Sequence, residues 1–162
     1  MSAVDPRLSI NQGTIKYADL ATALRVTVEA GVQSIGLWRE PVQEVGLATA
    51  ASMLTDSGLR FSTHCRSGFF TMPEGPARRA SIADNLVAIE EAATLAAAGA
   101  PGSAAVLVLV AGGLPDGSRD LVGARERVRD ALGELAPHAA DAGVTLAIEP
   151  LHPMYATDRC VV

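Results

Sequence analysis

The chain of 162 residues is poor in several residue types, and each shortage argues against a class of protein. Lys16 is its single lysine and its formal net charge is −5, which disfavours binding of nucleic acid through phosphate contacts. Its two cysteines, Cys65 and Cys160, are too few for a disulfide scaffold and form no CxxC motif. No apolar run approaches the ~18 residues of a membrane span, and no signal-peptide pattern is present. We therefore expect a cytoplasmic protein with reduced thiols that binds neither membranes nor nucleic acid.

Hydrophobic residues, in contrast, make up 49% of the sequence, and glycines separate successive apolar segments. Four times an amphipathic pattern closes with a glycine, at Gly31, Gly58, Gly99 and Gly143, and an apolar run follows soon after. These runs, together with one near the N-terminus, predict five strands over residues 8–15, 32–38, 59–66, 104–111 and 144–149. Strands that alternate with helices so regularly predict an α/β fold with a parallel sheet in the order (βα)4β5.

Apolar residues spaced three and four positions apart predict the helices between these strands. The four periods begin at Tyr17, Leu47, Ile82 and Val128. Pro41 and Pro76 suit the openings of the second and third helices, where a missing backbone N–H costs little. Thr157 could cap one more helix, of which the sequence contains about one turn.

Alternate residues along the predicted strands differ in character, which favours a barrel over an open sheet. One set is aliphatic and should lie under the helices: Leu8, Ile10, Ile35, Leu37, Leu59, Phe61, Leu146 and Ile148. The other set is small at first and polar at the carboxyl ends: Ser9, Asn11, Ser34, Gly36, Trp38, Ser62, His64, Arg66, Thr145, Ala147 and Glu149. We expect residues 1–162 to form a single incomplete domain, the N-terminal (βα)4β5 part of a (β/α)8 TIM barrel truncated within the fifth helix. An open, doubly wound sheet is the alternative.

Glu149 is the leading candidate for catalysis and for metal binding. A carboxylate at the end of an apolar strand must be solvated, paired or bound to a cation, and in a barrel this position faces the active-site mouth. The alternative is a carboxylate that accepts hydrogen bonds from loop amides. His152 lies in the following loop between two prolines. It could bind a metal, donate to a substrate hydroxyl or transfer a proton, or it could be an ordinary surface histidine.

Four residues of the second set are candidates for substrate binding. His64 and Arg66 could hold an anionic substrate, or could be an interior histidine and an arginine that enters a solvated loop. Trp38 could stack on a sugar ring or fill the core, and Asn11 could orient a hydroxyl or cap a turn. Because adjacent residues point to opposite faces of a strand, the thiol of Cys65 should lie against the helices.

Several segments carry a resemblance to a known family. They are the strand of Asn11, Ile-Gly-Leu-Trp at 35–38, His-Cys-Arg-Ser-Gly-Phe-Phe at 64–70, Asp-Asn at 84–85 and Ile-Glu-Pro-Leu-His-Pro at 148–153. Together they resemble the first half of a sugar phosphate isomerase/epimerase of the xylose isomerase-like TIM barrel superfamily. The resemblance implies a divalent metal, Mn²⁺ or Mg²⁺, with Glu149 as its first carboxylate ligand. It also implies an Asp, a His and a Glu from strands six to eight, without which this chain should have little activity alone.

The resemblance implies proton transfer on a ketose or polyol, with Glu149 as ligand and possible base. An inosose dehydratase-like lyase and an apurinic endonuclease-like repair enzyme are alternatives within the same superfamily, and the acidic charge disfavours the second. A further alternative is a non-enzymatic half-barrel that pairs with a second copy or with another chain. Our leading expectation is an isomerase/epimerase with a small sugar or polyol substrate, which could be a homo-oligomer.

Overall fold

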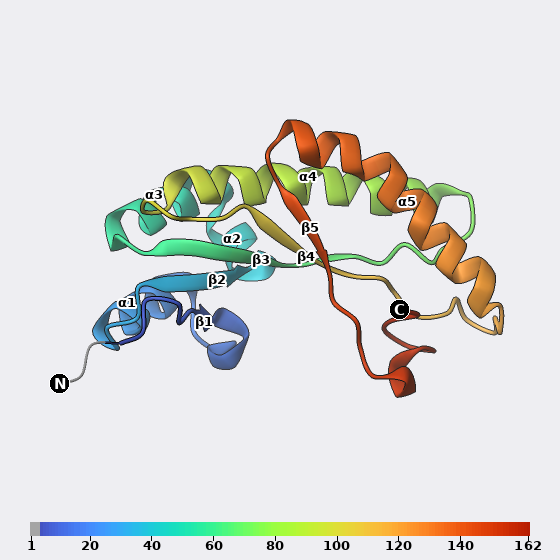
Figure 1. The fold of residues 1–162 in the computed structure, drawn as a ribbon, viewed down its shortest axis with the longest axis horizontal. Helices are drawn as coiled ribbons and strands as arrows, with labels where there is room; N and C mark the ends of the chain where they lie inside the picture. Colours follow the sequence, from blue (N-terminus) through green and yellow to red (C-terminus); the bar gives the residue numbers. More distant parts are fainter. Residues whose placement is uncertain (1–3) are drawn as a thin grey trace. The chain divides into compact units, whose positions relative to one another are not determined.

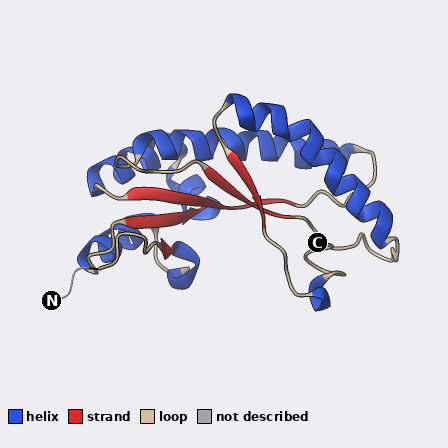
Figure 2. Ribbon diagram, viewed as in Figure 1, coloured by secondary structure: helices blue, strands red, loops and turns tan. Residues whose placement is uncertain are grey.

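The computed structural model describes residues 4–162, in which strands and helices alternate along the chain (Figures 1 and 2). The strands follow the order β1-β2-β3-β4-β5 in one sheet, and β2 is parallel to both β1 and β3. The predicted α/β half-barrel is therefore confirmed. The elements are β1 (Ile10–Asn11), η1 (Gln12–Ile15), α1 (Leu20–Glu29), β2 (Ser34–Trp38), α2 (Arg39–Val45), α3 (Leu47–Ser57), β3 (Arg60–Gly68), α4 (Pro76–Ala98), β4 (Val106–Val110), α5 (Leu121–Asp141), β5 (Thr145–Ile148) and η2 (Pro153–Tyr155).

The chain divides into two compact units, which are described separately below. The first unit contains Met1–Cys65 and Glu91–Val106, and the second contains Arg66–Glu90 and Leu107–Val162. Within residues 4–162, no helix combines the length and the apolar character that a membrane crossing requires.

The core of the first unit lies between its strands and its helices. Ile35 and Leu37 of β2 and Phe61 of β3 are at most 1% exposed, as expected for the aliphatic strand face. The helices cover them with apolar side chains, which are Leu20, Ala23, Leu24, Val42, Ala50, Leu54 and Leu95.

The second predicted helix is two helices, α2 and α3, separated by Gly46. Gly46 has a φ of 83°, a conformation that glycine adopts more readily than any other residue, so it breaks the helical path. Pro41 lies within the first turn of α2, and Pro76 is the first residue of α4, as predicted.

β3 contains an extra residue, Ser62, relative to β2. The register pairs Ile35 with Phe61, but the next residue of β2, Gly36, pairs with Thr63. This is a β-bulge, which bends a strand and adds one residue to one side of the ladder. A Cβ at position 36 would collide with Oγ1 of Thr63, so any residue other than glycine would require the Thr63 side chain to move.

The bulge reverses the alternation of side chains in the rest of β3. His64 pairs with Leu37, whose side chain is fully buried in the core, and Cys65 pairs with Trp38. Paired residues of parallel strands share a face, so His64 lies on the helix side and Cys65 on the opposite side. The faces predicted for His64 and Cys65 are therefore wrong, because the prediction assumed an unbroken strand.

β1 is shorter than predicted, because the chain turns into η1 after Asn11. The Asn11 side chain accepts a hydrogen bond from the Gly13 N–H at 2.8 Å and so caps this 3₁₀ helix. The strand expected to continue to Ile15 therefore ends at Asn11.

The second unit contains α5, whose buried side chains are Ala124, Val128, Ala131, Leu135 and Ala139. The Asp120 carboxylate accepts from the Gly123 N–H at 2.8 Å and caps this helix. Ile148, at the end of β5, belongs to the set predicted to lie under the helices, but it is 41% exposed. The aliphatic face of β5 is thus only partly covered.

No helix begins at Thr157, so that prediction is wrong. The Cys160 N–H donates to Tyr155 O at 2.9 Å, and Cys160 forms a parallel bridge with Gly112. The Val161 N–H then donates to Gly112 O at 3.0 Å. Tyr155 O and Gly112 O therefore satisfy these two backbone N–H groups, whereas a single helical turn is too short to be stable.

Gly68, the last residue of β3, provides a test of the packing in the second unit. Its φ is 112°, and a Cβ there would collide with the carbonyl oxygen of Val110. We expect Gly68→Ala to lower the free energy of unfolding by about 3 kcal/mol, through backbone strain and overpacking. In the control Gly133→Ala on α5, the new Cβ meets nothing within 4 Å, and helix propensity should raise stability by up to ~1 kcal/mol. Urea denaturation measures both, and equal effects of the two changes would contradict the described packing.

Candidate functional site

The indole of Trp38 is held at the carboxyl end of β2 by residues that follow β1. Its Nε1–H donates to Asn11 Oδ1 at 2.8 Å, and its backbone N–H donates to Gln12 Oε1 at 2.9 Å. A Cβ at Gly13 would lie 2.7 Å from ring atom Cζ2, so the backbone of η1 packs directly on the ring. The ring is fixed and half-buried, which suits the predicted stacking on a sugar. That role stays a prediction.

Asn11 acts in this structure as a cap and as a support for Trp38. Both lone pairs of its Oδ1 are used, by the Gly13 N–H and by the indole N–H. Its side-chain NH₂ is the group left for a substrate hydroxyl. Gln12, which sequence analysis missed, is 1% exposed, and its Nε2 has no hydrogen-bond partner among residues 4–162.

A pocket of about 390 Å³ adjoins these residues in the first unit. Gln12 and Trp38 line it together with the acidic residues Asp19, Glu40 and Glu44. The aromatic wall and the carboxylate acceptors could bind hydroxyl groups, whereas the excess of acidic side chains opposes a phosphate.

Glu91 of α4 lies at the centre of a buried charged cluster in the first unit. Its Oε2 accepts from Arg39 Nε at 2.8 Å and lies 3.0 Å from His64 Nε2, and its Oε1 accepts from Gln43 Nε2 at 3.2 Å. The side chain of Glu91 is 7% exposed and that of His64 is fully buried. The cluster joins α2, β3 and α4 through one carboxylate.

The protonation of this cluster follows from its hydrogen bonds. Burial raises the pKa of Glu91. Hydrogen bonds from His64, Arg39 and Gln43 together lower this pKa by more than burial raises it, so it falls from 4.5 to about 2. Ionised Glu91 can only accept, so Nε2 of His64 carries a proton. Nδ1 of His64 is buried without a hydrogen-bond partner in the described part of the chain. To reach a substrate, His64 would have to leave Glu91.

Glu149 follows β5 directly and belongs to the second unit. Its backbone N–H donates to Leu109 O at 2.9 Å, which continues the pairing of β5 with β4. Its side chain is exposed and makes no hydrogen bond or ion pair with any residue of 4–162. The alternative, a carboxylate that accepts from loop amides, is therefore absent from the described residues. Whether Glu149 faces a cavity shared with Asn11 and Trp38 stays a prediction.

His152 caps the 3₁₀ helix η2. Its Nδ1 accepts from the Met154 N–H at 3.2 Å, so the neutral imidazole carries its proton on Nε2. An exposed Nε2–H can donate to a substrate oxygen. To bind a metal through Nε2, His152 would have to move the proton to Nδ1 and give up the cap, so this tautomer favours donation.

Arg66 and Phe69 lie in the segment at the end of β3. The Arg66 guanidinium carbon lies 5.8 Å from the centroid of the Phe69 ring, a cation–π contact. The buried Asn85 of α4 holds this segment, because its Oδ1 accepts from Ser67 Oγ and from the Gly68 N–H, each at 2.8 Å. Phe69 and Asn85 were not among the predicted site residues, and their only sequence signal is their place in the segments that carry the family resemblance.

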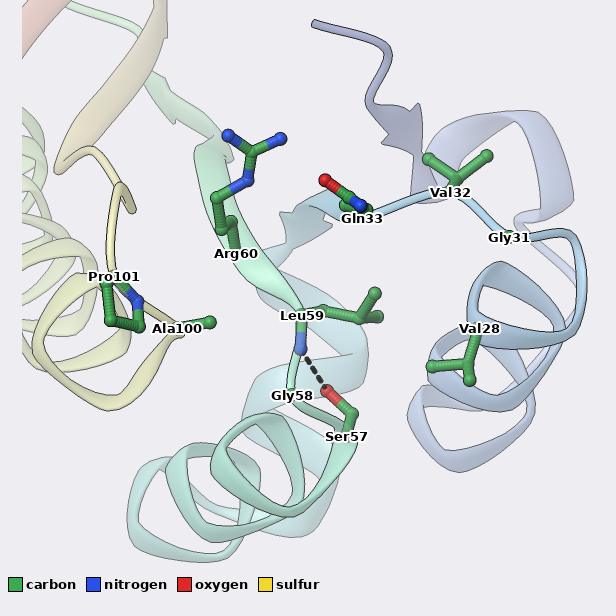
Figure 3. Close-up of a pocket in the computed structure, with 10 residues that line it drawn as sticks. All are labelled: Val28, Gly31, Val32, Gln33, Ser57, Gly58, Leu59, Arg60, Ala100 and Pro101. Carbon is green, nitrogen blue, oxygen red and sulfur yellow. Dashed lines mark hydrogen bonds between the residues drawn. The ribbon is translucent and has the colours of Figure 1, made fainter. Parts of the chain in front are cut away.

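A further pocket of the first unit lies at the other end of its strands (Figure 3). It has a volume of about 430 Å³ and is formed where α1, α3 and α4 pass into the next strands, around Gln33, Leu59 and Pro101. The Leu59 N–H donates to Ser57 Oγ at 3.2 Å within it. Active sites of these barrels lie at the carboxyl ends of the strands, so this pocket is not our candidate.

The residues present do not complete a divalent metal site. No group of three or more His, Cys, Asp or Glu side chains in residues 4–162 could hold a metal ion. Glu149 offers one carboxylate, and Nδ1 of His152 is already used by η2. Any metal bound at Glu149 would need ligands from outside the described residues.

The family model described as a xylose isomerase-like TIM barrel matches residues 5–160 of this chain. The chain belongs to this family. Its half-barrel of parallel strands agrees with such a barrel, and the predicted resemblance is confirmed. No curated protein matches the chain.

Solved structures agree with this xylose isomerase-like assignment. Protein SMc04130 from Sinorhizobium meliloti 1021 is 44% identical over 96% of this chain and 54% of its own, with a TM-score of 0.87. A D-psicose 3-epimerase solved with D-fructose is 16% identical over 90% and 52%, with a TM-score of 0.70. The IolI protein, solved with a zinc atom, is 18% identical over 86% and 50%, with a TM-score of 0.69. The last two show the fold alone, and the chain spans about half the length of all three.

The buried cluster makes stability depend on pH in acid. A folded-state pKa below the ordinary one contributes stability that is complete above pH 4.5 and is lost as the pH falls towards 2. The difference between 4.5 and about 2 corresponds to about 3 kcal/mol. We expect Glu91→Gln to remove about this much of the pH dependence of unfolding in that range. Glu90→Gln, which changes an exposed neighbour on α4, is the control. Urea denaturation from pH 2 to 6 measures the free energy of unfolding of both variants. If Glu91→Gln kept the wild-type dependence of this free energy on pH, as the control should, the described cluster would be contradicted.

The support of Trp38 can be followed by fluorescence, because it is the only tryptophan of the chain. Asn11→Ala removes the acceptor of the indole N–H, so we expect emission at longer wavelength, stronger quenching by acrylamide and a stability loss of about 1 kcal/mol. Gln33→Ala, at an exposed residue just before β2, is the control. Unchanged emission and quenching in Asn11→Ala would show that the indole does not depend on Asn11.

Proposed function

We propose that this chain forms the first part of a metal-dependent sugar isomerase/epimerase that acts on a ketose or polyol by proton transfer, with Glu149 in its active site. The observation that supports this most directly is the exposed, unpaired carboxylate of Glu149 at the carboxyl end of a parallel strand in a xylose isomerase-like barrel. Barrel enzymes carry their reacting groups at such positions.

The chemistry available at Glu149 is that of a general base. A carboxylate with no ion pair or hydrogen bond among the described residues is free to accept a proton from the carbon next to a substrate carbonyl. Its backbone is fixed by the bond from its N–H to Leu109 O, and Pro150 favours an extended backbone at Glu149 itself. The side chain therefore extends from a fixed strand end.

His152 would act as a donor in the proposed reaction. With Nδ1 capping η2, its Nε2–H can donate a hydrogen bond to a substrate hydroxyl or carbonyl oxygen. Arg66 and Trp38 are proposed to bind the substrate, the first through its guanidinium and the second through its ring face.

A divalent metal, Mn²⁺ or Mg²⁺, remains part of the proposal, with Glu149 as one of its ligands. A metal of this kind polarises the oxygens of a bound sugar. The bound zinc in the related IolI structure supports metal binding in this fold, but the further ligands would have to come from outside residues 4–162.

The test combines this chain with the missing half of a barrel. The chain is co-expressed with the part of the Sinorhizobium meliloti protein that it does not match, since it matches 54% of that protein's length. The pair is incubated with D-fructose in D₂O and Mn²⁺, and NMR follows exchange of the proton next to the carbonyl. We expect exchange that EDTA abolishes, and that Glu149→Gln slows by roughly 10²–10⁴-fold through loss of the base.

The control for that experiment is Glu126→Gln, which changes an exposed carboxylate on α5. It should leave exchange unchanged. Full exchange in Glu149→Gln would rule out Glu149 as the base, and a complemented barrel that never exchanges the proton of a ketose would rule out the proposed reaction.

A further inference from the structure

Phe69 has an unusual backbone conformation. Its φ is 63°, and it is the only residue other than glycine with a positive φ among residues 4–162. A left-handed backbone is costly for a bulky side chain, because Cβ approaches the following carbonyl. A glycine would adopt this conformation without that cost. The phenylalanine ring must therefore contribute something that a glycine could not.

The loop around Phe69 is held firmly enough to maintain the strain. The Phe69 N–H donates to Val110 O at 2.7 Å, and its carbonyl accepts from Ser81 Oγ at 3.1 Å. On its N-terminal side, the Gly68 N–H donates to Asn85 Oδ1 at 2.8 Å and the Gly68 carbonyl accepts from Asn85 Nδ2 at 2.9 Å. Strain that its surroundings enforce in this way is typical of functional sites.

The strain does not serve to bury the Phe69 ring. The side chain of Phe69 is 45% exposed, whereas that of the next residue, Phe70, is 2% exposed. Phe70 therefore supplies the core contact of this loop, and Phe69 presents its ring at the surface. The guanidinium carbon of Arg66 lies over this ring, 5.8 Å from its centroid.

The Phe69 ring lines a pocket of about 480 Å³ in the second unit, between the segments that follow β3 and β4. Met72, Pro73, Leu114 and Pro115 line it as well, so much of its wall is apolar. A volume of this size accommodates a small organic ligand.

The polar groups of this pocket are few and partly occupied. Thr71 Oγ1 already donates to Gly113 O, and the charged side chains of the lining are Asp116 and Asp158. These two carboxylates can accept from only a few hydroxyl groups, so a ring covered with hydroxyl groups would not replace most of its hydrogen bonds to water, whereas an apolar group has none to lose.

The pocket lies at the same end of β4 as Glu149. Gly112, which lines the pocket, is bridged to Cys160, and Cys160 Sγ donates to Glu149 O at 3.5 Å. The Glu149 N–H in turn donates to Leu109 O, three residues before Gly112. All of these residues belong to the second unit.

We propose that Phe69 is a specificity-determining residue whose ring binds an apolar substituent of the substrate, so that the preferred substrate is a glycoside of a keto sugar with an apolar aglycone rather than a free sugar. A ketone elsewhere on the sugar ring supplies the carbonyl for the proposed proton transfer, and the glucosides used below lack it and report binding alone. The inference rests on the proposed function for the sugar part of the substrate. The strained backbone is retained because it presents the ring to the aglycone.

Two ligands and two variants test this role. Isothermal titration without added metal compares phenyl β-D-glucopyranoside with methyl β-D-glucopyranoside on the wild-type chain. We expect the phenyl glycoside to bind at least ~10-fold more tightly, because its ring stacks on Phe69. Phe69→Ala should reduce its affinity to that of the methyl glycoside and leave the methyl glycoside unaffected. Val122→Ala, which shortens an apolar side chain on α5 that is 70% exposed, should change neither affinity.

Thermal unfolding separates the ring from the backbone. Phe69→Gly removes the ring and the strain together, whereas Phe69→Ala removes only the ring. We expect Phe69→Gly to melt roughly 2–4 °C higher than Phe69→Ala while it loses the same preference for the phenyl glycoside. A structural role for the ring alone would lower the melting temperature of both variants and leave the ratio of the two affinities unchanged.

Four results would overturn the proposal: equal affinities for the two glycosides, no binding of either, a preference that survives Phe69→Ala, or a Phe69→Gly variant that melts below Phe69→Ala. The role of Phe69 and the proposed reaction at Glu149 can fail independently of each other. A chain that prefers the phenyl glycoside but whose complemented barrel never exchanges a ketose proton would refute only the reaction at Glu149. Proton exchange without the preference would refute only the role of Phe69.

Discussion

One extra residue in β3, Ser62, determines which polar side chains the first unit has to bury. Because the bulge reverses the alternation, His64 lies beneath the helices instead of facing away from them. A buried imidazole needs a hydrogen-bond partner, and Glu91 of α4 supplies it. That carboxylate would be costly to bury alone, so Arg39 and Gln43 of α2 complete its hydrogen bonds. A single inserted residue thus leads to a cluster that ties together two helices and a strand.

The same cluster bears on the aromatic residue at the end of β2. Arg39 follows Trp38 directly, so the ion pair between Arg39 and Glu91 fixes the backbone on one side of the tryptophan. On the other side, Asn11 holds the indole and the side chain of Gln12 holds the backbone N–H of Trp38. The Arg39–Glu91 ion pair and the side-chain amides of Asn11 and Gln12 therefore restrain Trp38 together. A ring that is restrained before binding loses little conformational entropy when a ligand stacks on it.

The strands, the helices and the parallel order could be predicted from the sequence, because glycines and apolar periods mark each joint. The face of His64 could not, since Ser62 and Thr63 are both small and polar and the alternation looks the same with or without a bulge. The burial of Glu91 could not be predicted either. Glu91 follows Glu90 in an alanine-rich helix, and alanines on every face of that helix leave no clear apolar periodicity that marks its buried side. Of the candidate site, the position of Glu149 at a strand end follows from the pattern. The strain at Phe69 does not, because backbone dihedrals of a loop depend on contacts, such as that with Asn85, that are distant in sequence.

The brevity of β1 has a consequence for how copies of this chain meet. β1 lies at one end of the strand order, where its outer backbone groups could in principle recruit a strand from another molecule. Only Ile10 and Asn11 are extended, and the chain then coils into η1. Two extended residues offer another strand few backbone groups to pair with, so β1 is a poor site for the addition of a strand from another molecule.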